Sequence, residues 1–235
     1  MIDFHTHILP GIDDGSRDIG MTEAMLREER RQGVRLVVAT PHFYADQMSI
    51  DGFLERRAAA LDRTLRLREA DGTLPEVLAG ADVCYFPGIG GAKTLERLCV
   101  EGTRTILVEP PFEPWNEGLL WDLELLVLRR KLNVVLAHIE RYPPFQRDWD
   151  VFDRVTALPL TAQINAGSFD RRGSLMHRKQ RRGFCLKYIQ THEAWIVGSD
   201  CHNTTDRRPN MSDALAEIGA EAIGRMYVIS RGLLE

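Results

Sequence analysis

The chain has 235 residues, of which 44% are hydrophobic and 27% are charged, and its formal net charge is −4. This is the composition of an ordinary globular protein that can bury a sizeable core, and the negative charge gives no general case for binding nucleic acid. No apolar run is long enough to cross a bilayer, so membrane insertion is not expected. The four cysteines form no CxxC pair, which argues against a zinc knuckle and a disulfide framework. With no recognisable signal peptide, we expect a reduced, cytoplasmic enzyme.

Short β-rich runs alternate with longer amphipathic stretches along the chain. A helix is expected from an N-cap at Ser16 to about Gln32, where Gly33 ends it. Apolar residues recur at helical spacing over residues 50–68 and again over residues 117–131, which predicts two further amphipathic helices. Strands are predicted over residues 2–4, 34–39, 77–80, 105–108, 134–137, 162–165 and 194–198.

The alternation of strands and helices, repeated seven times, argues for a parallel sheet. With this many units a closed barrel is favoured, so we expect an α/β fold, a distorted TIM-like (β/α)7 barrel. No linker, low-complexity tract or internal repeat divides the chain. We therefore expect a single domain over residues 1–235.

Polar side chains follow almost every predicted strand. They are His5 and His7, His42, Asp82, Glu109, His138, Asn165, and Asp200 with His202. The carboxyl ends of the strands share one face of an α/β barrel. Strand side chains alternate, so the spacing within the first pair and within the last pair puts both members on one side. Imidazoles and carboxylates gathered in this way are typical of a metal cluster, so the sequence predicts a metal site at that face.

Longer motifs surround these residues: MIDFHTH, IDDGS, ATPH, AGADV, LVEPPF, AHIERY, QINAGS, and GSDCHN followed by RRPNM. In this combination and order the chain resembles the polymerase-and-histidinol-phosphatase (PHP) superfamily of metal-dependent phosphoesterases. It looks most like the bacterial capsule-synthesis branch, which consists of manganese-dependent protein-tyrosine phosphatases. An isolated HxH would not be specific, whereas this set of motifs spans nearly the whole chain.

The resemblance implies three divalent metal ions, with manganese as the expected metal and iron, zinc or magnesium as alternatives. The first ion would be held by His5, His7, Asp82 and Asp200, the second by Asp82, Glu109 and His138, and the third by Asp14, His42 and His202. Arg141 and Arg207 match positions that are expected to clamp phosphate. The bridging carboxylate is usually Glu in this branch. Because Asp82 is shorter by one methylene, the ions must lie closer together or the strand must shift.

The activity implied by the resemblance is hydrolysis of phosphotyrosine in proteins by a hydroxide bound between the first two ions. Clustered metals lower the pKa of bound water and stabilise charge on the phosphoryl oxygens, and arginine adds planar bidentate contacts. The implied partner is the phosphorylated tyrosine kinase that regulates capsule or exopolysaccharide export.

Two alternative functions stay open. One is a small-molecule phosphomonoesterase of the histidinol-phosphatase type, although that branch tends to carry His where this chain has Glu109. The other is a metal-binding regulatory module without turnover.

Two shorter motifs suggest other chemistries, and neither is adopted. Cys201 and Arg207 have the CX5R spacing of cysteine-dependent tyrosine phosphatases. The glycines that let backbone amides face a phosphate are missing there, and strand alternation turns Cys201 away from the metals if its two neighbours point toward them. Residues 88–94 superficially match a nucleotide-binding loop, but Ala92 separates glycine from lysine. We expect a turn before a short helix instead.

Three features remain open from the sequence. Residues 171–187 carry seven basic side chains and no acidic one, which indicates either a solvated helix face or a docking surface for an acidic phosphotyrosine tail. His177 and His192 lie outside the strand-end pattern and are expected to be ordinary helix or surface residues. Several aromatic residues adjoin the proposed ligands and could either wall an aromatic-substrate pocket or pack the loops; they are Phe43, Tyr44, Phe112, Trp115 and Tyr142.

Overall fold

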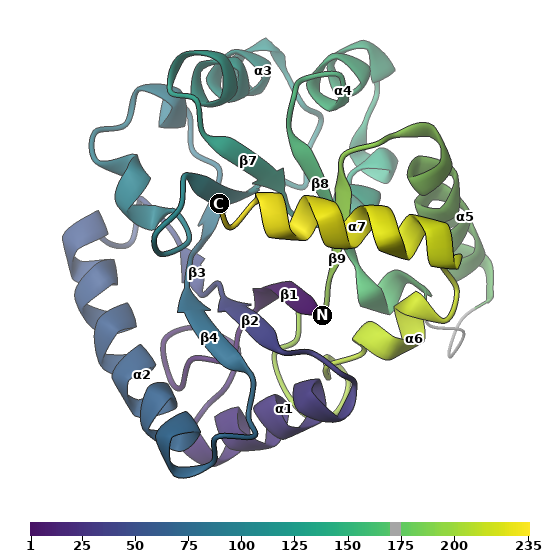
Figure 1. Ribbon diagram of the computed structural model, residues 1–235. Coiled ribbons are helices and arrows are strands. Elements are labelled where there is room, and N and C mark those ends of the chain that lie inside the picture. Colours follow the sequence, from purple (N-terminus) through teal and green to yellow (C-terminus); the bar gives the residue numbers. More distant parts are fainter. Residues whose placement is uncertain (170–174) are drawn as a thin grey trace.

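A ring of parallel strands surrounded by helices forms the protein (Figure 1). The computed structural model describes residues 1–169 and 175–235, without the side chains of residues 175–178. Three strands pair in the order β1-β2-β4, and six pair in the order β3-β5-β6-β7-β8-β9, all of them parallel. Their bounds are β1 Ile2–Thr6, β2 Leu36–Ala39, β3 His42–Phe43, β4 Glu76–Ala79, β5 Asp82–Cys84, β6 Thr105–Glu109, β7 Asn133–Leu136, β8 Thr161–Asn165 and β9 Trp195–Gly198.

Hydrogen bonds across the short interruptions join these strands into one ring. β2 and β3 are successive parts of one extended segment, as are β4 and β5, and Pro41 lies in the first interruption because it cannot donate to a ladder. The Asp82 amide donates to the Pro41 carbonyl at 3.0 Å. The last strand meets the first where the His7 amide donates to Cys201 O at 2.9 Å and the Asp200 amide donates to His5 O at 2.8 Å. Within the described residues the strands thus form seven segments, and the predicted distorted (β/α)7 barrel is confirmed.

The helices lie outside this ring. They are α1 Ile19–Arg31, α2 Ile50–Ala70, α3 Glu117–Glu124, which continues as a π-helical turn Leu125–Arg129, α4 Trp149–Thr156, α5 Leu175–Thr191, α6 Met211–Leu215 and α7 Ala220–Gly232. The helices predicted over residues 50–68 and 117–131 are both present. None of the described helices is long and apolar enough to cross a membrane.

The first helix begins later than the sequence suggests. Asp18, not Ser16, is the N-cap of α1, and its side chain accepts from the Met21 amide at 2.9 Å. Ser16 is fully buried, and its hydroxyl lies 2.9 Å from the Thr22 hydroxyl. The prediction of Ser16 as the cap was wrong because both residues are good caps, and tertiary burial uses one of them for packing. The helix ends before Gly33, as expected, and Gly33 has a positive φ of 88°.

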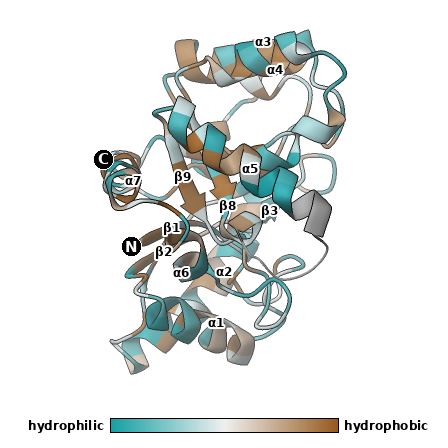
Figure 2. Ribbon diagram, turned by 90° about the vertical axis from the view of Figure 1, so that its right-hand side faces the viewer, coloured by the Kyte–Doolittle hydropathy of each residue, from teal (hydrophilic) through white to brown (hydrophobic). Residues whose placement is uncertain are grey.

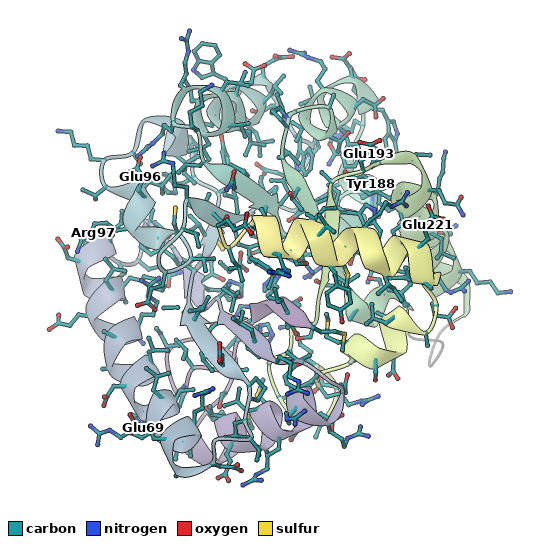
Figure 3. The ribbon with its side chains drawn as sticks, in the orientation of Figure 1. Glu69, Glu96, Arg97, Tyr188, Glu193 and Glu221 are labelled. Atoms are coloured by element: carbon teal, nitrogen blue, oxygen red, sulfur yellow. The ribbon has the colours of Figure 1, made fainter. Side chains whose placement is uncertain are left out.

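The hydrophobic residues are buried because helices surround the ring of strands. The strand β9 is hydrophobic and lies inside, while the helices around it carry hydrophilic residues (Figure 2). Val37, Val108 and Ile164 are fully buried, as in a parallel sheet covered by helices. Charged side chains such as Glu69, Glu96 and Glu221 lie on the outside (Figure 3).

One end of the barrel is closed by the last helix. α7 crosses the end at which the strands begin, close to the N-terminus (Figure 1). Beyond it, the Leu233 carbonyl accepts a hydrogen bond from the hydroxyl of Thr105, the first residue of β6. The opposite end, where the strands finish, holds the polar residues singled out above.

Candidate metal centre

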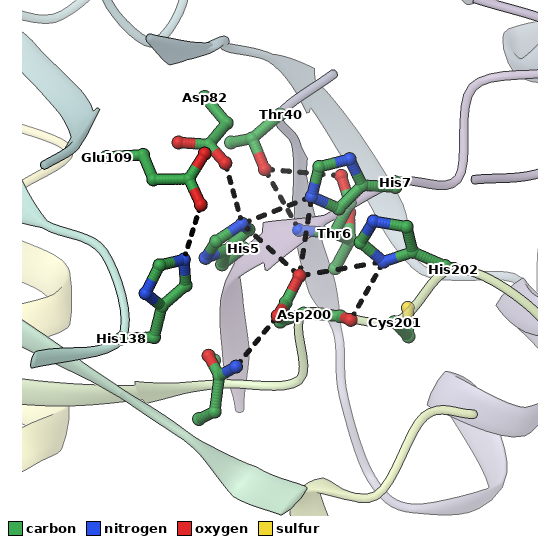
Figure 4. A network of polar contacts seen from close by, with 12 residues as sticks. His5, Thr6, His7, Thr40, Asp82, Glu109, His138, Asp200, Cys201 and His202 are labelled. Carbon is green, nitrogen blue, oxygen red and sulfur yellow. Dashed lines mark hydrogen bonds and ion pairs between the residues drawn. The ribbon is translucent and has the colours of Figure 1, made fainter. Parts of the chain in front are cut away.

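Nine predicted ligand residues converge at the carboxyl end of the barrel, most of them drawn in Figure 4. Their places follow from the strand register: His42 begins β3, Asp82 begins β5 and Glu109 ends β6. Parallel pairing sets His42 beside Asp82. The remaining positions are His5 in β1, His7 and Asp14 in the segment after it, His138 directly after β7, and Asp200 and His202 after β9.

The first group of donors lies around His5, which is fully buried. Its Nε2 is 3.1 Å from His7 Nε2, 3.3 Å from Asp82 Oδ2 and 3.6 Å from Asp200 Oδ1. Donor atoms of His5, His7 and Asp200 all lie within 4.8 Å of one another. This arrangement brings together the four residues predicted for the first ion.

A second group lies around Asp14, whose side chain is 62% exposed. Asp14 Oδ1 is 3.3 Å from His202 Nε2 and 3.6 Å from His42 Nε2. Donor atoms of these three residues and of His7 lie within 4.8 Å of one another. The three residues predicted for the third ion are therefore adjacent, and His7 lies close enough to join them.

The residues predicted for the second ion are also adjacent, with one addition. Glu109 Oε1 is 3.0 Å from His138 Nε2, and Glu109 Oε2 is 3.7 Å from His42 Nδ1. His42 therefore faces Asp14 with one nitrogen and the Asp82–Glu109 pair with the other. Cys84, which the sequence interpretation overlooked as a donor, forms a third close group with His42 and Glu109.

Several buried donor atoms in this centre have no hydrogen-bond partner. Both carboxylate oxygens of Asp82 are in this state although the residue is fully buried, as are His42 Nδ1, His138 Nδ1 and His202 Nε2. Leaving such groups unpaired costs free energy, more so for a carboxylate. A set of imidazole and carboxylate donors with free lone pairs fits divalent metal ions.

Burial and nearby charges shift the pKa values of two imidazoles in opposite directions: the pKa of His7 is raised and that of His202 is lowered. Burial opposes the charged form of His7, but hydrogen bonds and charges from Asp13 and Asp200 outweigh burial and raise its pKa to about 10. Burial and the charge of His7 lower the pKa of His202 to about 3. Although burial opposes ionisation of Asp200, the charges and hydrogen bonds of the surrounding histidines hold its pKa well below the usual range. His202 is thus ready to donate a lone pair, whereas His7 must first release a proton.

A set of amide and carboxylate side chains orients the donors; the sequence interpretation singled out Asn165 but missed Asp13 and Gln163. Asp13 Oδ2 lies 2.7 Å from His7 Nδ1, and Gln163 Oε1 lies 3.1 Å from His5 Nδ1 and accepts from the His138 amide at 2.7 Å. The side-chain amide of Asn165 donates to Asp200 Oδ2 at 2.7 Å. Such partners fix the ring orientation of ligating histidines. The sequence feature that could have revealed Gln163 is the alternation of side chains along β8, which puts residues 163 and 165 on one face.

The backbone of the candidate metal centre contains both strained and tightly packed positions. His138 and Asp200 have positive φ values of 33° and 51°, a region that non-glycine residues rarely adopt. A Cβ on Gly15 would lie 2.2 Å from the His7 carbonyl oxygen. Strain of this kind persists only where the surrounding structure fixes it, and it clusters at functional sites.

Two arginines border a cavity of about 630 Å³ above the donors. Arg207 Nη2 lies 3.0 Å from Asp200 Oδ1, and Arg141 Nη1 lies 3.8 Å from Asp200 Oδ2. Both side chains are more than a third exposed, at 40% and 35%. The cavity is also lined by His42, Glu109 and His138. The arginines therefore face a space that is open to solvent and bordered by the candidate ligands.

The aromatic residues divide between this cavity and the core. Tyr44 and Phe112 line the cavity and are 38% and 39% exposed. The Arg141 guanidinium lies over the Phe112 ring, 4.5 Å from its centroid. Trp115 and Tyr142 are buried and pack against each other, and Phe43 packs in the core against Phe53. Two of the five aromatic residues thus face the cavity, and three are packing.

The model of the family described as "Capsular polysaccharide synthesis, CpsB/CapC" matches residues 1–230. This chain belongs to the CpsB/CapC family. The match to this capsule-synthesis family confirms the resemblance drawn from the sequence motifs.

Curated CpsB/CapC relatives are similar over most of their length. Tyrosine-protein phosphatase YwqE of Bacillus subtilis is 30% identical over 229 residues, which are 94% of this chain and 86% of the relative. Tyrosine-protein phosphatase CpsB of Streptococcus pneumoniae is 27% identical over 91% of this chain and 88% of the relative.

Solved structures agree with these relatives. The structure described as YwqE from Bacillus subtilis and CpsB from Streptococcus pneumoniae, "unique metal-dependent tyrosine phosphatases", matches with a TM-score of 0.84 and 26% identity over 100% of this chain and 94% of that one. An organophosphorus hydrolase from Deinococcus radiodurans matches with a TM-score of 0.60 at 12% identity, over 99% of this chain and 92% of that one. The second likeness concerns the barrel fold alone.

The CX5R segment at Cys201 and the glycine-containing residues 88–94, which the sequence analysis rejected as phosphate-binding loops, have the structures expected there. Cys201 is fully buried, its Sγ is 3.8 Å from Glu29 Oε1, and burial raises the pKa of its thiol well above the usual range. Gly88 adopts a positive φ of 86° in a turn before the short helix Ile89–Gly91. Neither segment therefore has the geometry of a phosphate-binding loop.

The remaining open features lie on or near α5. His192 stacks on the ring of Tyr188, as a packing residue does. The side chain of His177 lies outside the described residues, as do those of Arg171, Arg172 and Arg178 in the basic stretch 171–187. Lys179, Arg181 and Lys187 are exposed on α5. Both interpretations of the basic stretch therefore stay open.

Proposed function

We propose that this chain is a metal-dependent phosphatase that removes phosphate from tyrosine residues of proteins. The convergence of nine imidazole and carboxylate side chains beside two exposed arginines carries the proposal. Two further findings support it: the CpsB/CapC relatives are named tyrosine-protein phosphatases, and the similar YwqE and CpsB structures are described as metal-dependent. We propose further that residues 1–235 act as a single domain.

The proposed metals are three divalent ions, with manganese first and iron, zinc and magnesium as alternatives. The residues that would hold them are His5, His7, Asp82 and Asp200 for the first, Asp82, Glu109 and His138 for the second, and Asp14, His42 and His202 for the third. Bound divalent ions supply an activated water and stabilise charge on phosphoryl oxygens. Oxygen-rich ligand sets suit manganese, but zinc binds mixed imidazole and carboxylate sites more tightly.

The residues of the chain itself bind and orient the substrate in this proposal. Arg141 and Arg207 donate to the phosphoryl oxygens, where a planar guanidinium can make two contacts. Tyr44 and Phe112 give the phenyl ring apolar surface at the cavity wall. The leaving tyrosinate has a conjugate-acid pKa of about 10, low enough that a strong general acid is not essential.

The natural substrate that we propose is the phosphorylated tyrosine kinase of polysaccharide export, encountered in the cytoplasm. The support is the family description, which concerns capsular polysaccharide synthesis. A phosphotyrosine on a flexible tail can reach the cavity because the two arginines at its border are partly exposed.

A substrate panel tests the proposal. Protein stripped with EDTA and reloaded with one divalent metal at a time should hydrolyse phosphotyrosine peptides and para-nitrophenyl phosphate, with little action on histidinol phosphate or nucleotides. Preference for histidinol phosphate would make the chain a small-molecule phosphomonoesterase. Absence of turnover with every metal, although the metals bind, would make it a regulatory module.

A further inference from the structure

Cys84 lies inside the metal centre, unlike the other cysteines. It ends β5 two residues after Asp82, so strand alternation puts both side chains on the same face. It pairs in register with Glu109, the last residue of β6. Its side chain is only partly buried and lines the cavity. A thiol therefore faces the same space as the candidate ligands.

The donors around Cys84 form a compact set. Its Sγ donates to Glu109 Oε2 at 3.1 Å, and a donor atom of His42 lies within 4.8 Å of both. An independent observation comes from Asp82, which is fully buried and leaves both carboxylate oxygens without a hydrogen-bond partner. Asp82 Oδ2 points into this set, 3.2 Å from His42 Nδ1. A buried carboxylate that makes no hydrogen bond and lies beside three close donors favours a bound cation in this set.

We propose that Cys84 is a thiolate ligand of an ion held together with His42, Asp82 and Glu109. The inference rests on the proposed metal-dependent function. It adds the Cys84 sulfur, together with the His42 Nδ1 atom that faces Asp82 and Glu109, to the ligands proposed for the second ion. On binding, the thiol releases its proton to solvent and the sulfur gives a lone pair to the ion, without any change of oxidation state. Thiolate favours zinc, iron or cobalt over manganese and magnesium. This position of the centre is therefore selective for a thiophilic divalent ion.

Cobalt binding tests the proposal with a readout that is independent of turnover. Metal-stripped protein titrated with Co²⁺ should develop the near-ultraviolet absorption of a thiolate–cobalt bond. Cys84→Ser and Cys84→Ala should lose this band. Cys99→Ser should keep it, because Cys99 is also a free thiol but belongs to none of the close donor groups found among the described residues. Circular dichroism identifies any variant that fails to fold, and the second substitution then replaces the first.

Metal competition gives the quantitative expectation. In equimolar Zn²⁺ and Mn²⁺, Cys84→Ser should lower the ratio of bound zinc to bound manganese by roughly 10-fold or more, on the scale of losing a metal-site partner. A cobalt-loaded wild-type protein without the band, or a band that persists in both Cys84 variants, would overturn the proposal.

The outcome separates this inference from the proposed function. Phosphotyrosine hydrolysis by a wild-type protein that lacks the band would leave the phosphatase assignment in place and make Cys84 only a hydrogen-bond donor to Glu109. The band without hydrolysis of any phosphoester would keep the ligand and remove the phosphatase assignment.

Discussion

At the scale of single residues, Asp200 contacts both the other proposed metal ligands and the arginines that we propose to bind phosphate. One carboxylate oxygen faces His5, His7 and His202 at 3.5–3.6 Å, and the same oxygen accepts from Arg207 at 3.0 Å. The Asn165 amide holds the other oxygen. The position of Asp200 at a positive φ is thus fixed from several sides, as a strained functional residue requires.

The two arginines should affect turnover more than metal content. A guanidinium aimed at a phosphoryl oxygen can strengthen its contacts as charge redistributes in the transition state. Arg141→Ala and Arg207→Ala should each lower kcat/KM by roughly 100-fold, on the scale of losing one oxyanion donor. Arg208→Ala is the matched control, since Arg208 bonds to Asp213. Loss of metal together with activity would show that the arginines support the ligands instead.

The buried thiol should be dispensable for catalysis. Cys201 has no access to the cavity, and its sulfur faces Glu29. Cys201→Ser should retain most of the phosphatase activity, while EDTA should abolish activity in both proteins. If the variant is inactive although folded and fully loaded with metal, a cysteine-dependent mechanism replaces the metal-dependent one.

At the scale of elements, the junction of the last strand with the first positions the centre. Hydrogen bonds between the β9 and β1 segments tie Asp200 to His5 and His7 to Cys201. Gly198 ends β9 directly behind His5, and a Cβ there would lie 2.9 Å from His5 Cβ and 3.0 Å from Gln163 Nε2. The absence of a side chain at this position lets the two strands approach.

Gly198→Ala should therefore displace His5. We expect a loss of about 1–3 kcal/mol in the free energy of unfolding, typical of overpacking, together with weaker metal binding. Gly224→Ala in α7 is the control, because a Cβ there meets nothing within 4 Å and should stabilise the helix slightly. Denaturant unfolding and metal titration measure both effects. Equal behaviour of the two variants would mean that β9 moves freely away from His5.

At the scale of the whole molecule, the two ends of the barrel are specialised differently. α7 covers the end where strands begin, and the centre occupies the end where they finish (Figures 1 and 4). The centre concentrates carboxylates and buried donor atoms without hydrogen-bond partners, which bound divalent ions would satisfy. Metal occupancy should consequently contribute to the stability of the whole protein.

Divalent metal should raise the melting temperature of the stripped protein. A ligand at 100 times its Kd stabilises the folded state by about 2.7 kcal/mol, which corresponds to roughly 5–10 °C for a chain of this size. Asp82→Ala should lose most of this shift, hold less metal and be almost inactive, since Asp82 is among the residues proposed to hold two of the ions. A normal shift and normal turnover in Asp82→Ala would show that another residue bridges them.

The sequence by itself determined the barrel and the residue types of the candidate metal centre. Alternating hydrophobic runs encode the strands locally, and the direction of parallel strands then brings His5, Glu109 and His138 to one end. The sequence-predicted resemblance to a capsule-synthesis family also needed only local motifs in order, and the family match confirmed it.

Only the tertiary structure decided which atoms meet at that end. Asp18 displaced Ser16 as a cap because the Ser16 hydroxyl is buried against Thr22. His42 came to face two donor groups because Asp14 and Asp82 reach it from other segments of the chain. Gln163 and Cys84 joined the centre through contacts with neighbouring strand segments: Gln163 accepts from the backbone amide of His138, directly after β7, and Cys84 pairs in register with Glu109 of β6. Register is set by the sum of many long-range contacts, and no single stretch of sequence contains that sum.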